Sequence, residues 1–272
     1  MQVWTAELFF FLSRGSIVIH LLASQVARRR WCGITLTLAT MGLWKRQGAR
    51  MLVSHRHRFI YTKTGKTAGT SVESYFERFC MEHGRWTESH YRDESVSPAG
   101  IVGFRGRDIP EGCLWWNHMS AELIRDRIGA GIWESYFKFC VVRNPYEKVL
   151  SNFYFLREIN AFSAYPAESD AAQFERWLTT SEVPLDRDKY LVDGRLCMDF
   201  VVKYESLHAD LEHVCSRLSL PWRPELLPKF KAGMRPATGA VATMYTPTSA
   251  EVVRSIYDFE FDCFGYSRDL VS

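Results

Sequence analysis

The chain has 272 residues, of which 47% are hydrophobic and 24% are charged, the composition of an ordinary globular protein with one sizeable core. The net charge of +3 is too small to indicate a nucleic-acid partner. The seven cysteines are odd in number and include no CxxC pair, which argues against a disulfide scaffold or a zinc site and predicts a mainly reduced protein.

The first 50 residues have an ambiguous pattern. Residues 8–27 are apolar but contain Arg14, which disfavours a signal peptide. Residues 31–44 are uncharged but reach only about three-quarters of a membrane-spanning length. A membrane anchor at 1–50 is one interpretation. We favour a loosely helical extension or start-site artefact ahead of a main domain at 51–272. The expected location is then the cytoplasm, with membrane anchoring as the alternative.

The next segment predicts a strand, a tight turn and a helix. Phe59–Thr62 is short, apolar and β-prone, and residues 71–79 follow with helical spacing of apolar side chains. Backbone N–H groups at a helix start carry partial positive charge and suit a phosphate. Lys66 adds a mobile full charge, and Gly69 allows close approach of the backbone. The candidate phosphate-binding residues are Lys66, Thr67, Ala68, Gly69, Thr70 and Ser71, with hydroxyl donors at Thr70 and Ser71.

Two other interpretations apply to this turn. Gly65-Lys66-Thr67 is half of a Walker A loop, but the full pattern needs glycine at position 60, which is Ile60. Thr70 and Glu73 have the spacing of a capping box, so the segment can also be a simple helix cap. A cap alone does not need Lys66 or Gly69.

A second strand-to-helix junction follows a long polar stretch. Residues 84–112 are rich in Gly and Pro, with one short strand expected near Ile101–Phe104, and we expect this loop to line part of the substrate pocket. Phe137–Val142 reads as a buried strand. It is followed by Arg143, by Asn144 as a good N-cap and by a helix expected over 145–158.

Arg143 therefore stands at the carboxyl end of a strand, where open α/β sheets bind ligands. Ser151 lies along the following helix, and an arginine fork with a serine hydroxyl can hold a second phosphate. Taken alone, the pair is equally consistent with an arginine that binds a neighbouring carbonyl and a serine that faces solvent.

The remaining pattern alternates helices and strands. Helices are expected at 172–178 and 207–218, a strand at 200–202, and a last helix behind a capping box at Thr248 and Glu251. Residues 229–247 show no periodicity. Together these elements predict an α/β fold in three layers, with a P-loop-like central parallel sheet flanked by helices.

The two junctions together resemble a known family. Lys-Thr-Ala-Gly-Thr-Ser at 66–71, and Val-Arg-Asn-Pro-Tyr at 142–146 with Ser151, are similar to the motifs of sulfotransferases that use 3′-phosphoadenylyl sulfate (PAPS), in the carbohydrate-modifying branch. The resemblance runs from about Arg58 to Tyr266. It implies that the first motif binds the 5′-phosphosulfate and that Arg143 and Ser151 bind the 3′-phosphate. Many relatives have Pro where this chain has Gly65, and His where it has Lys63.

The resemblance also suggests catalytic roles. Lys66 can stabilise charge on the departing phosphate. His118 matches a histidine that precedes the second motif in carbohydrate-type relatives, and it is the expected general base. A histidine packed beside Trp115 and Trp116 is the structural alternative, and Glu73 is the second candidate base. No metal ion is implied.

Three functions from different classes stay open. The first is PAPS-dependent sulfation of an acceptor hydroxyl, with a carbohydrate or glycolipid favoured through the resemblance alone. The second is a P-loop kinase or nucleotide hydrolase, which lacks its glycine at position 60 and a clear acidic Mg²⁺ ligand. The third is a non-catalytic nucleotide-binding module. The sequence does not specify the oligomeric state.

Overall fold

The computed structural model describes residues 12–13, 16–17, 51–106, 108–116, 118–162, 168–230 and 241–270. It divides the chain into two units, residues 1–41 and 42–272. In the first unit, β1 (Leu12–Ser13) and β2 (Ser16–Ile17) pair antiparallel, where a loose helix was expected. The rest of that expected helix lies outside the described residues. Within the described part of the chain, no helix is long and apolar enough to cross a membrane.

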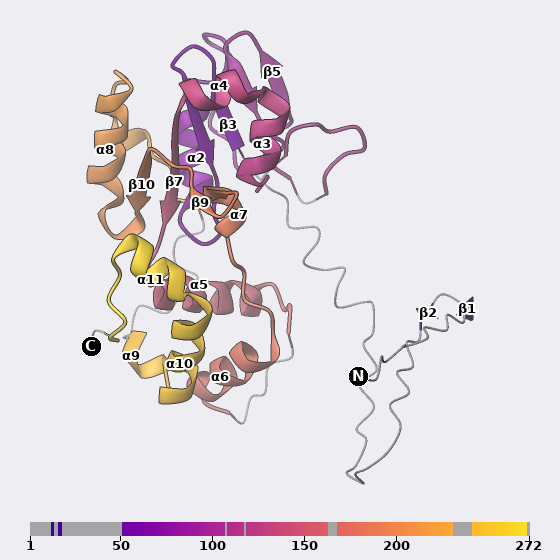
Figure 1. Cartoon of the computed structure of the whole chain (residues 1–272), viewed down its shortest axis with the longest axis vertical. Helices are drawn as coiled ribbons and strands as arrows, with labels where there is room; N and C mark the ends of the chain where they lie inside the picture. The colour runs from indigo at the N-terminus through magenta and orange to yellow at the C-terminus, as the bar shows by residue number, and fades with distance from the viewer. Residues whose placement is uncertain are drawn as a thin grey trace, which may run out of the picture. The chain divides into compact units, whose positions relative to one another are not determined.

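The second unit contains a sheet of six strands in the order β10-β7-β4-β3-β6-β5 (Figure 1). β10, β7 and β4 run parallel, whereas β3, β6 and β5 add antiparallel neighbours. The predicted α/β class is confirmed, but the sheet is mixed rather than wholly parallel. The strands are β3 (Met51–Ser54), β4 (Phe59–Thr62), β5 (Ser95–Ser97), β6 (Gly100–Val102), β7 (Phe137–Val142) and β10 (Phe200–Lys203).

Helices surround this sheet and continue beyond it. They are α2 (Gly69–Glu77), α3 (Ala121–Ile128), α4 (Ala130–Ser135), α5 (Pro145–Glu158), α6 (Asp170–Thr180), α7 (Arg187–Tyr190), α8 (Leu207–Arg217), α9 (Val241–Met244), α10 (Pro247–Ile256) and α11 (Asp258–Phe264). Two 3₁₀ turns, η1 (Tyr204–Ser206) and η2 (Pro224–Leu226), and a hairpin of β8 (Leu191–Val192) and β9 (Arg195–Leu196) complete the described elements.

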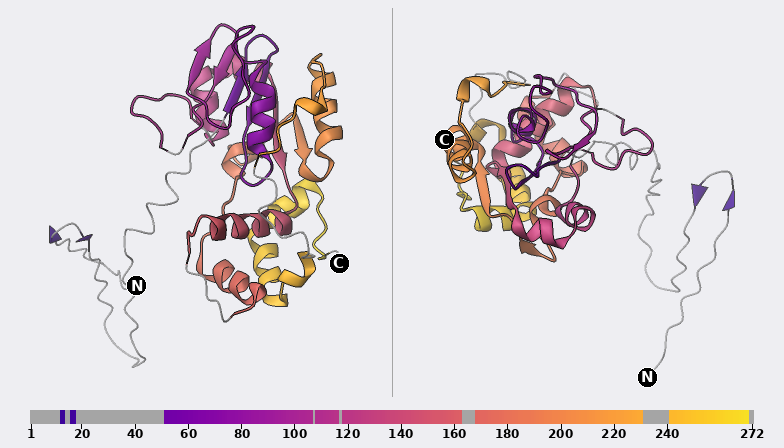
Figure 2. Two further views of the ribbon diagram at one scale, coloured as in Figure 1. Left: turned by 180° about the vertical axis from the view of Figure 1, so that it is seen from behind. Right: turned by 90° about the horizontal axis from the view of Figure 1, so that it is seen from above.

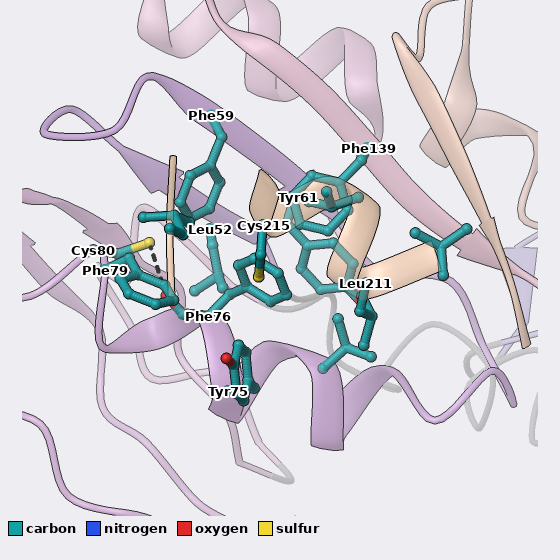
Figure 3. Packing of buried hydrophobic residues seen from close by; sticks show 14 of the residues in the cluster. Leu52, Phe59, Tyr61, Tyr75, Phe76, Phe79, Cys80, Phe139, Leu211 and Cys215 are labelled. Carbon is teal, nitrogen blue, oxygen red and sulfur yellow. Dashed lines mark hydrogen bonds between the residues drawn. The ribbon is translucent and has the colours of Figure 1, made fainter. Parts of the chain in front are cut away.

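The two faces of the sheet are covered by different helices. Alternate residues of a strand point to opposite faces. Phe59 and Tyr61 therefore pack with Phe76 of α2 and Leu211 of α8 (Figure 3), while Ile60 packs with α3 and α4 on the other face. The left view of Figure 2, seen from behind, shows α2 in front of the sheet. α3 and α4 lie on the other side of the sheet (Figure 1). This arrangement confirms the three-layer prediction.

A separate cluster of buried side chains joins the helices after the second junction. Its members come from α5, α6, α10 and α11 and include Phe153, Phe174, Val253 and Phe261. β7 leads into α5 after two residues, and this cluster packs α5 against the helices beyond the end of the sheet (Figure 1). A firmly packed α5 gives the side chains on its opposite face fixed positions.

One detail at a helix boundary differs from the prediction. The last capping box joins Thr246 to Ser249, and α10 begins at Pro247, so the expected pair at Thr248 and Glu251 was wrong by two residues. The cysteines of the described residues are free thiols, and Cys140 and Cys215 are buried. Burial raises the pKa of the Cys215 thiol to about 11, which keeps it protonated at neutral pH.

Candidate active site

The carboxyl ends of the three parallel strands meet at one edge of the sheet. Thr62 at the end of β4 pairs with Cys140 of β7, and Lys203 at the end of β10 pairs with Val142. The segments that leave these strands are therefore neighbours. Both predicted phosphate-binding junctions lie at this edge, as expected for ligand sites in α/β sheets.

The first junction has a backbone shape that suits an anion. Lys66 has φ 63° and Ala68 has φ 58°, with Thr67 at negative φ between them. Such alternation turns successive N–H groups toward one concave side, an arrangement that binds phosphates. Ala68 is the N-cap of α2, and among the described residues no side chain caps this helix start. The loop therefore presents backbone N–H groups and a helix N-terminus together.

Hydroxyl groups behind the loop hold it to the sheet. The Thr67 side chain is fully buried and shares a hydrogen bond with Thr64 Oγ1 at 2.8 Å. Thr64 Oγ1 in turn donates to the carbonyl oxygen of Val141 in β7. The Thr67 side chain thus points into the protein, and any contact of Thr67 with a ligand is made by its backbone. Ser71 Oγ accepts from the backbone N–H of Phe230, and its own O–H can still donate.

The second junction has the predicted local structure. Asn144 is the N-cap of α5 and accepts from the N–H of Tyr146 at 3.0 Å, and Pro145 is the first helical residue. Glu205 Oε1 accepts from the N–H of Asn144 at 2.8 Å, and Glu205 Oε2 accepts from the Tyr266 hydroxyl at 2.9 Å. This carboxylate therefore holds the start of α5.

Arg143 connects the two junctions directly. Its Nη1 donates to the carbonyl oxygen of Lys66 at 3.3 Å, and its Nη2 bonds to Glu147 at 2.9 Å. The guanidinium carbon lies 4.2 Å from the ring centroid of Tyr204, which follows β10. Arg143 therefore touches segments that follow all three parallel strands.

One face of α5 lies along the first loop. Glu147, Ser151 and Phe155 are four residues apart, so they share this face. Glu147 binds Arg143, and Lys66 Nζ lies 3.9 Å from the ring centroid of Phe155. Ser151 stands between these two contacts on the same face. The spacing thus brings Ser151 to the helix surface that carries the contacts of both cationic site residues.

His118 lies beside the first loop, although it is distant in sequence. Its Nδ1 is 3.1 Å from the carbonyl oxygen of Lys63, the residue that follows β4. His118 adopts a left-handed backbone conformation with φ 57° and is half-buried. A carbonyl oxygen can only accept, so Nδ1 carries the proton in this contact and Nε2 is the basic nitrogen of the neutral ring. Asn117, which precedes it in the family-like motif, lies outside the described residues.

Glu73 lies away from the surface. Its side chain is fully buried and pairs with Lys63 Nζ at 3.3 Å and with Arg105 Nη1 at 3.5 Å. Because α2 begins at Gly69, Thr70 lies inside the helix and is not its N-cap, so the expected capping box with Glu73 was wrong.

One turn further along α2, Glu77 is also buried and pairs with Arg105 and Arg92. Burial raises its pKa, an effect that Arg105 and Arg92 oppose and Glu73 reinforces.

Asp186 is a site neighbour that the sequence did not indicate. Its Oδ2 accepts from the N–H of Gly65 at 2.9 Å and from Lys148 Nζ of α5 at 2.5 Å. Both Asp186 and Lys148 are buried. Because 121 positions separate Gly65 from Asp186, no local pattern could have identified this contact.

Comparisons with known proteins agree with this geometry. The sequence model of the sulfotransferase family matches residues 49–267. A protein of Archaeoglobus fulgidus described as uncharacterized is 29% identical over 111 residues, which cover 38% of this chain and 84% of that protein. No solved structure matches the chain.

Proposed function

The chain belongs to the sulfotransferase family, and we propose that it transfers a sulfuryl group from PAPS to an acceptor hydroxyl. The observation that carries this proposal is the contact of Arg143 with the Lys66 carbonyl, which joins an anion-binding loop to a second cationic junction. A donor with phosphate groups at both its 5′ and 3′ positions needs two such sites at one sheet edge.

The residues present fit this donor. In the proposal, backbone N–H groups of residues 66–70, with the hydroxyls of Thr70 and Ser71, hold the 5′-phosphosulfate. Arg143 and Ser151 hold the 3′-phosphate. The alternating sign of φ over residues 66–68 and the start of α2 at Gly69 support the first assignment. Ser151 lies on the same face of α5 as Glu147, the partner of Arg143, which supports the second assignment.

Lys66 is proposed to stabilise the leaving group. In transfer, the acceptor oxygen bonds to sulfur while the bond between sulfur and the bridging phosphate oxygen breaks, and negative charge grows on that phosphate. Lys66 belongs to the loop proposed to hold the 5′-phosphosulfate, and its ammonium, which lies 3.9 Å from the Phe155 ring centroid, has to turn toward that phosphate to act there. A cation placed there favours the charge that develops in the transition state.

His118 is proposed to accept the acceptor's proton. The bond of its Nδ1 to the Lys63 carbonyl holds the ring beside the loop and makes Nε2 the proton acceptor. Glu73 is the weaker candidate because it is fully buried and paired with two cations. Neither assignment depends on a metal ion.

The alternative functions have less support. A P-loop kinase or hydrolase needs a glycine at position 60 and a carboxylate on Mg²⁺. Position 60 is Ile60, and Asp186, a carboxylate that contacts the loop, is bonded to Gly65 and Lys148. A non-catalytic nucleotide-binding module has no need for Lys66 and His118 beside the loop.

We favour a carbohydrate or glycolipid acceptor and a cytoplasmic location, with anchoring through residues 1–50 as the alternative. The test is a screen in which labelled PAPS is offered with polysaccharides, glycolipids, small hydroxylated metabolites and tyrosyl peptides. Label transfer to any acceptor supports the proposal. A thermal-shift comparison of adenosine 3′,5′-bisphosphate with ATP and Mg²⁺ separates it from a kinase, which would prefer the second ligand.

A further inference from the structure

Building on the proposed function, we propose that Lys63 is a positioning residue that fixes the hydroxyl of Thr70 for donation to the 5′-phosphate. Lys63 follows β4 directly and is only 4% exposed. Its Nζ lies 3.0 Å from Thr70 Oγ1. A buried ammonium in contact with a ligand-binding hydroxyl needs an explanation, because burying a charge is costly.

The chemistry of the contact sets the direction of the Thr70 hydrogen. An ammonium group has donors and no acceptor, so the Thr70 oxygen accepts from Lys63. The Thr70 hydroxyl hydrogen must then point away from Lys63. Thr70 is the second residue of α2, so its hydroxyl stands at the helix start that forms the proposed phosphate site. Lys63 thereby orients Thr70 as a donor and adds positive charge behind it.

Buried charges hold Lys63 in this position. Glu73 Oε2 lies 3.3 Å from Lys63 Nζ and 3.5 Å from Arg105 Nη1, and Glu73 and Arg105 are fully buried. The carboxylate is thus shared between two cations, which fixes the ammonium of Lys63 next to Thr70. Glu73 then acts through Lys63, which gives it a role other than general base.

Gly69 lies directly against the Lys63 side chain. A Cβ at position 69 would lie 2.7 Å from Lys63 Cε and 2.8 Å from Lys63 Cγ, closer than real contacts allow. The glycine in the loop therefore leaves room for the Lys63 stem to pass from β4 to Thr70. A side chain at position 69 would therefore have to displace Lys63 from its contact with Thr70.

The test is a double-mutant cycle with two ligands. Lys63→Met keeps the stem and removes the charge, and Thr70→Ala removes the hydroxyl. Binding of adenosine 3′,5′-bisphosphate and of adenosine 3′-phosphate, which lacks the 5′-phosphate, is measured for the parent, both single variants and the double variant. We expect each single variant to bind the bisphosphate about 10- to 100-fold more weakly, the scale of one hydrogen bond to a charged group.

The pattern across the cycle decides the inference. Adenosine 3′-phosphate should bind all four proteins alike, and Lys63→Met should add little loss once Thr70 is alanine. Thr70→Ser, which keeps a hydroxyl, should restore most of the affinity. Equal loss for both ligands, or a full additional loss in the Thr70→Ala background, would overturn the role of Lys63. If Lys63→Met does not fold, the variant that combines Lys63→Met with Glu73→Gln takes its place in the cycle, because it also removes the buried charge opposite Lys63. A parent that binds neither ligand would instead refute the proposed function.

Discussion

The backbone N–H of Gly65 donates to the carboxylate of Asp186, which also binds Lys148 on α5. Asp186 therefore joins the first phosphate-binding loop to the helix of the second junction. Many relatives in the resembled family have proline at this position, and proline has no N–H to donate. Glycine at position 65 thus permits a contact that proline could not make.

Gly65→Pro and Gly65→Ala form a matched pair that tests this contact. Alanine keeps the N–H, and its Cβ would lie 3.7 Å from Asp186 Oδ2, an ordinary contact. We expect Gly65→Ala to change the affinity for adenosine 3′,5′-bisphosphate by no more than about 0.5 kcal/mol. Gly65→Pro should weaken it by about 1.5–3 kcal/mol, the value of a hydrogen bond to a charged group. Calorimetric titration measures both, and equal affinities for the two variants would show that the contact does not position the loop.

Lys66 and His118 should both affect kcat, but for different reasons. Lys66→Ala should lower kcat by about 10²–10³-fold, the scale for losing one donor to a developing charge. His118→Ala should lower kcat by about 10²–10⁴-fold, the scale for losing a general base. His118→Ala should also leave the affinity for adenosine 3′,5′-bisphosphate unchanged and flatten the acid limb of the pH–rate profile. Near-parental turnover of His118→Ala with that limb intact would place the base elsewhere.

Glu77 should make the stability of the protein depend on pH in a direction opposite to that of an ordinary salt bridge. Its folded-state pKa is raised above the ordinary 4.5, mainly by burial, so the fold favours the protonated form. The stability it contributes is complete below 4.5 and is lost as pH rises through the raised pKa. Glu77→Gln mimics the protonated form, so the free energy of unfolding of this variant relative to the parent should rise with pH across that window.

Urea unfolding of the parent and Glu77→Gln at several pH values between about 4 and 7.5 measures this difference. If the variant instead becomes relatively less stable as pH rises, Arg105 and Arg92 outweigh burial and the pKa of Glu77 is lowered.

The boundary between the two units can be tested by truncation. β3 begins at Met51 and lies between β4 and β6 in the sheet. A chain that starts at Met51 would therefore have a central strand at its N-terminus. A chain starting at Gly42, where the second unit begins, should fold and keep the donor affinity of the full chain. Circular dichroism and ligand titration check this. Loss of affinity on removing residues 1–41 would show that they belong to the functional protein.

The sequence predicted the features that depend on local signals. β4, β7 and the start of α5 follow from short apolar runs with a Gly, Asn or Pro two or three positions after them, whereas α2 begins at Gly69, two residues before the expected start. β3 was missed because its four residues show no periodicity, and its place depends on pairing with Ile60 and Ile101. The contact of Asp186 with Gly65 was missed because it joins residues that only the tertiary fold brings together.

The capping-box error has a different physical reason. Residues three positions apart at a helix start have the same spacing as neighbours on one face within a helix. Thr70 and Glu73 are such neighbours, and both bind Lys63. The sequence could not distinguish these arrangements, because the position of Lys63 depends on where β4 ends.

Arg143 links the two proposed phosphate sites, so its removal tests the assignment of the 3′-phosphate. Arg143→Ala should lose about 1.5–3 kcal/mol of affinity for adenosine 3′,5′-bisphosphate, the value of a charge-assisted contact. Adenosine 5′-phosphosulfate has no 3′-phosphate and should bind the variant and the parent alike. Glu147→Gln is the control, since it removes the charge bound to Arg143 and leaves the guanidinium in place.

The most direct measurement is calorimetric titration of the parent and Arg143→Ala with these two ligands. The proposed donor site predicts that the parent binds adenosine 3′,5′-bisphosphate more tightly than adenosine 5′-phosphosulfate, and that Arg143→Ala removes this preference. A parent that binds neither ligand, or an equal loss for both in Arg143→Ala, would contradict the claim that the two junctions form a PAPS site.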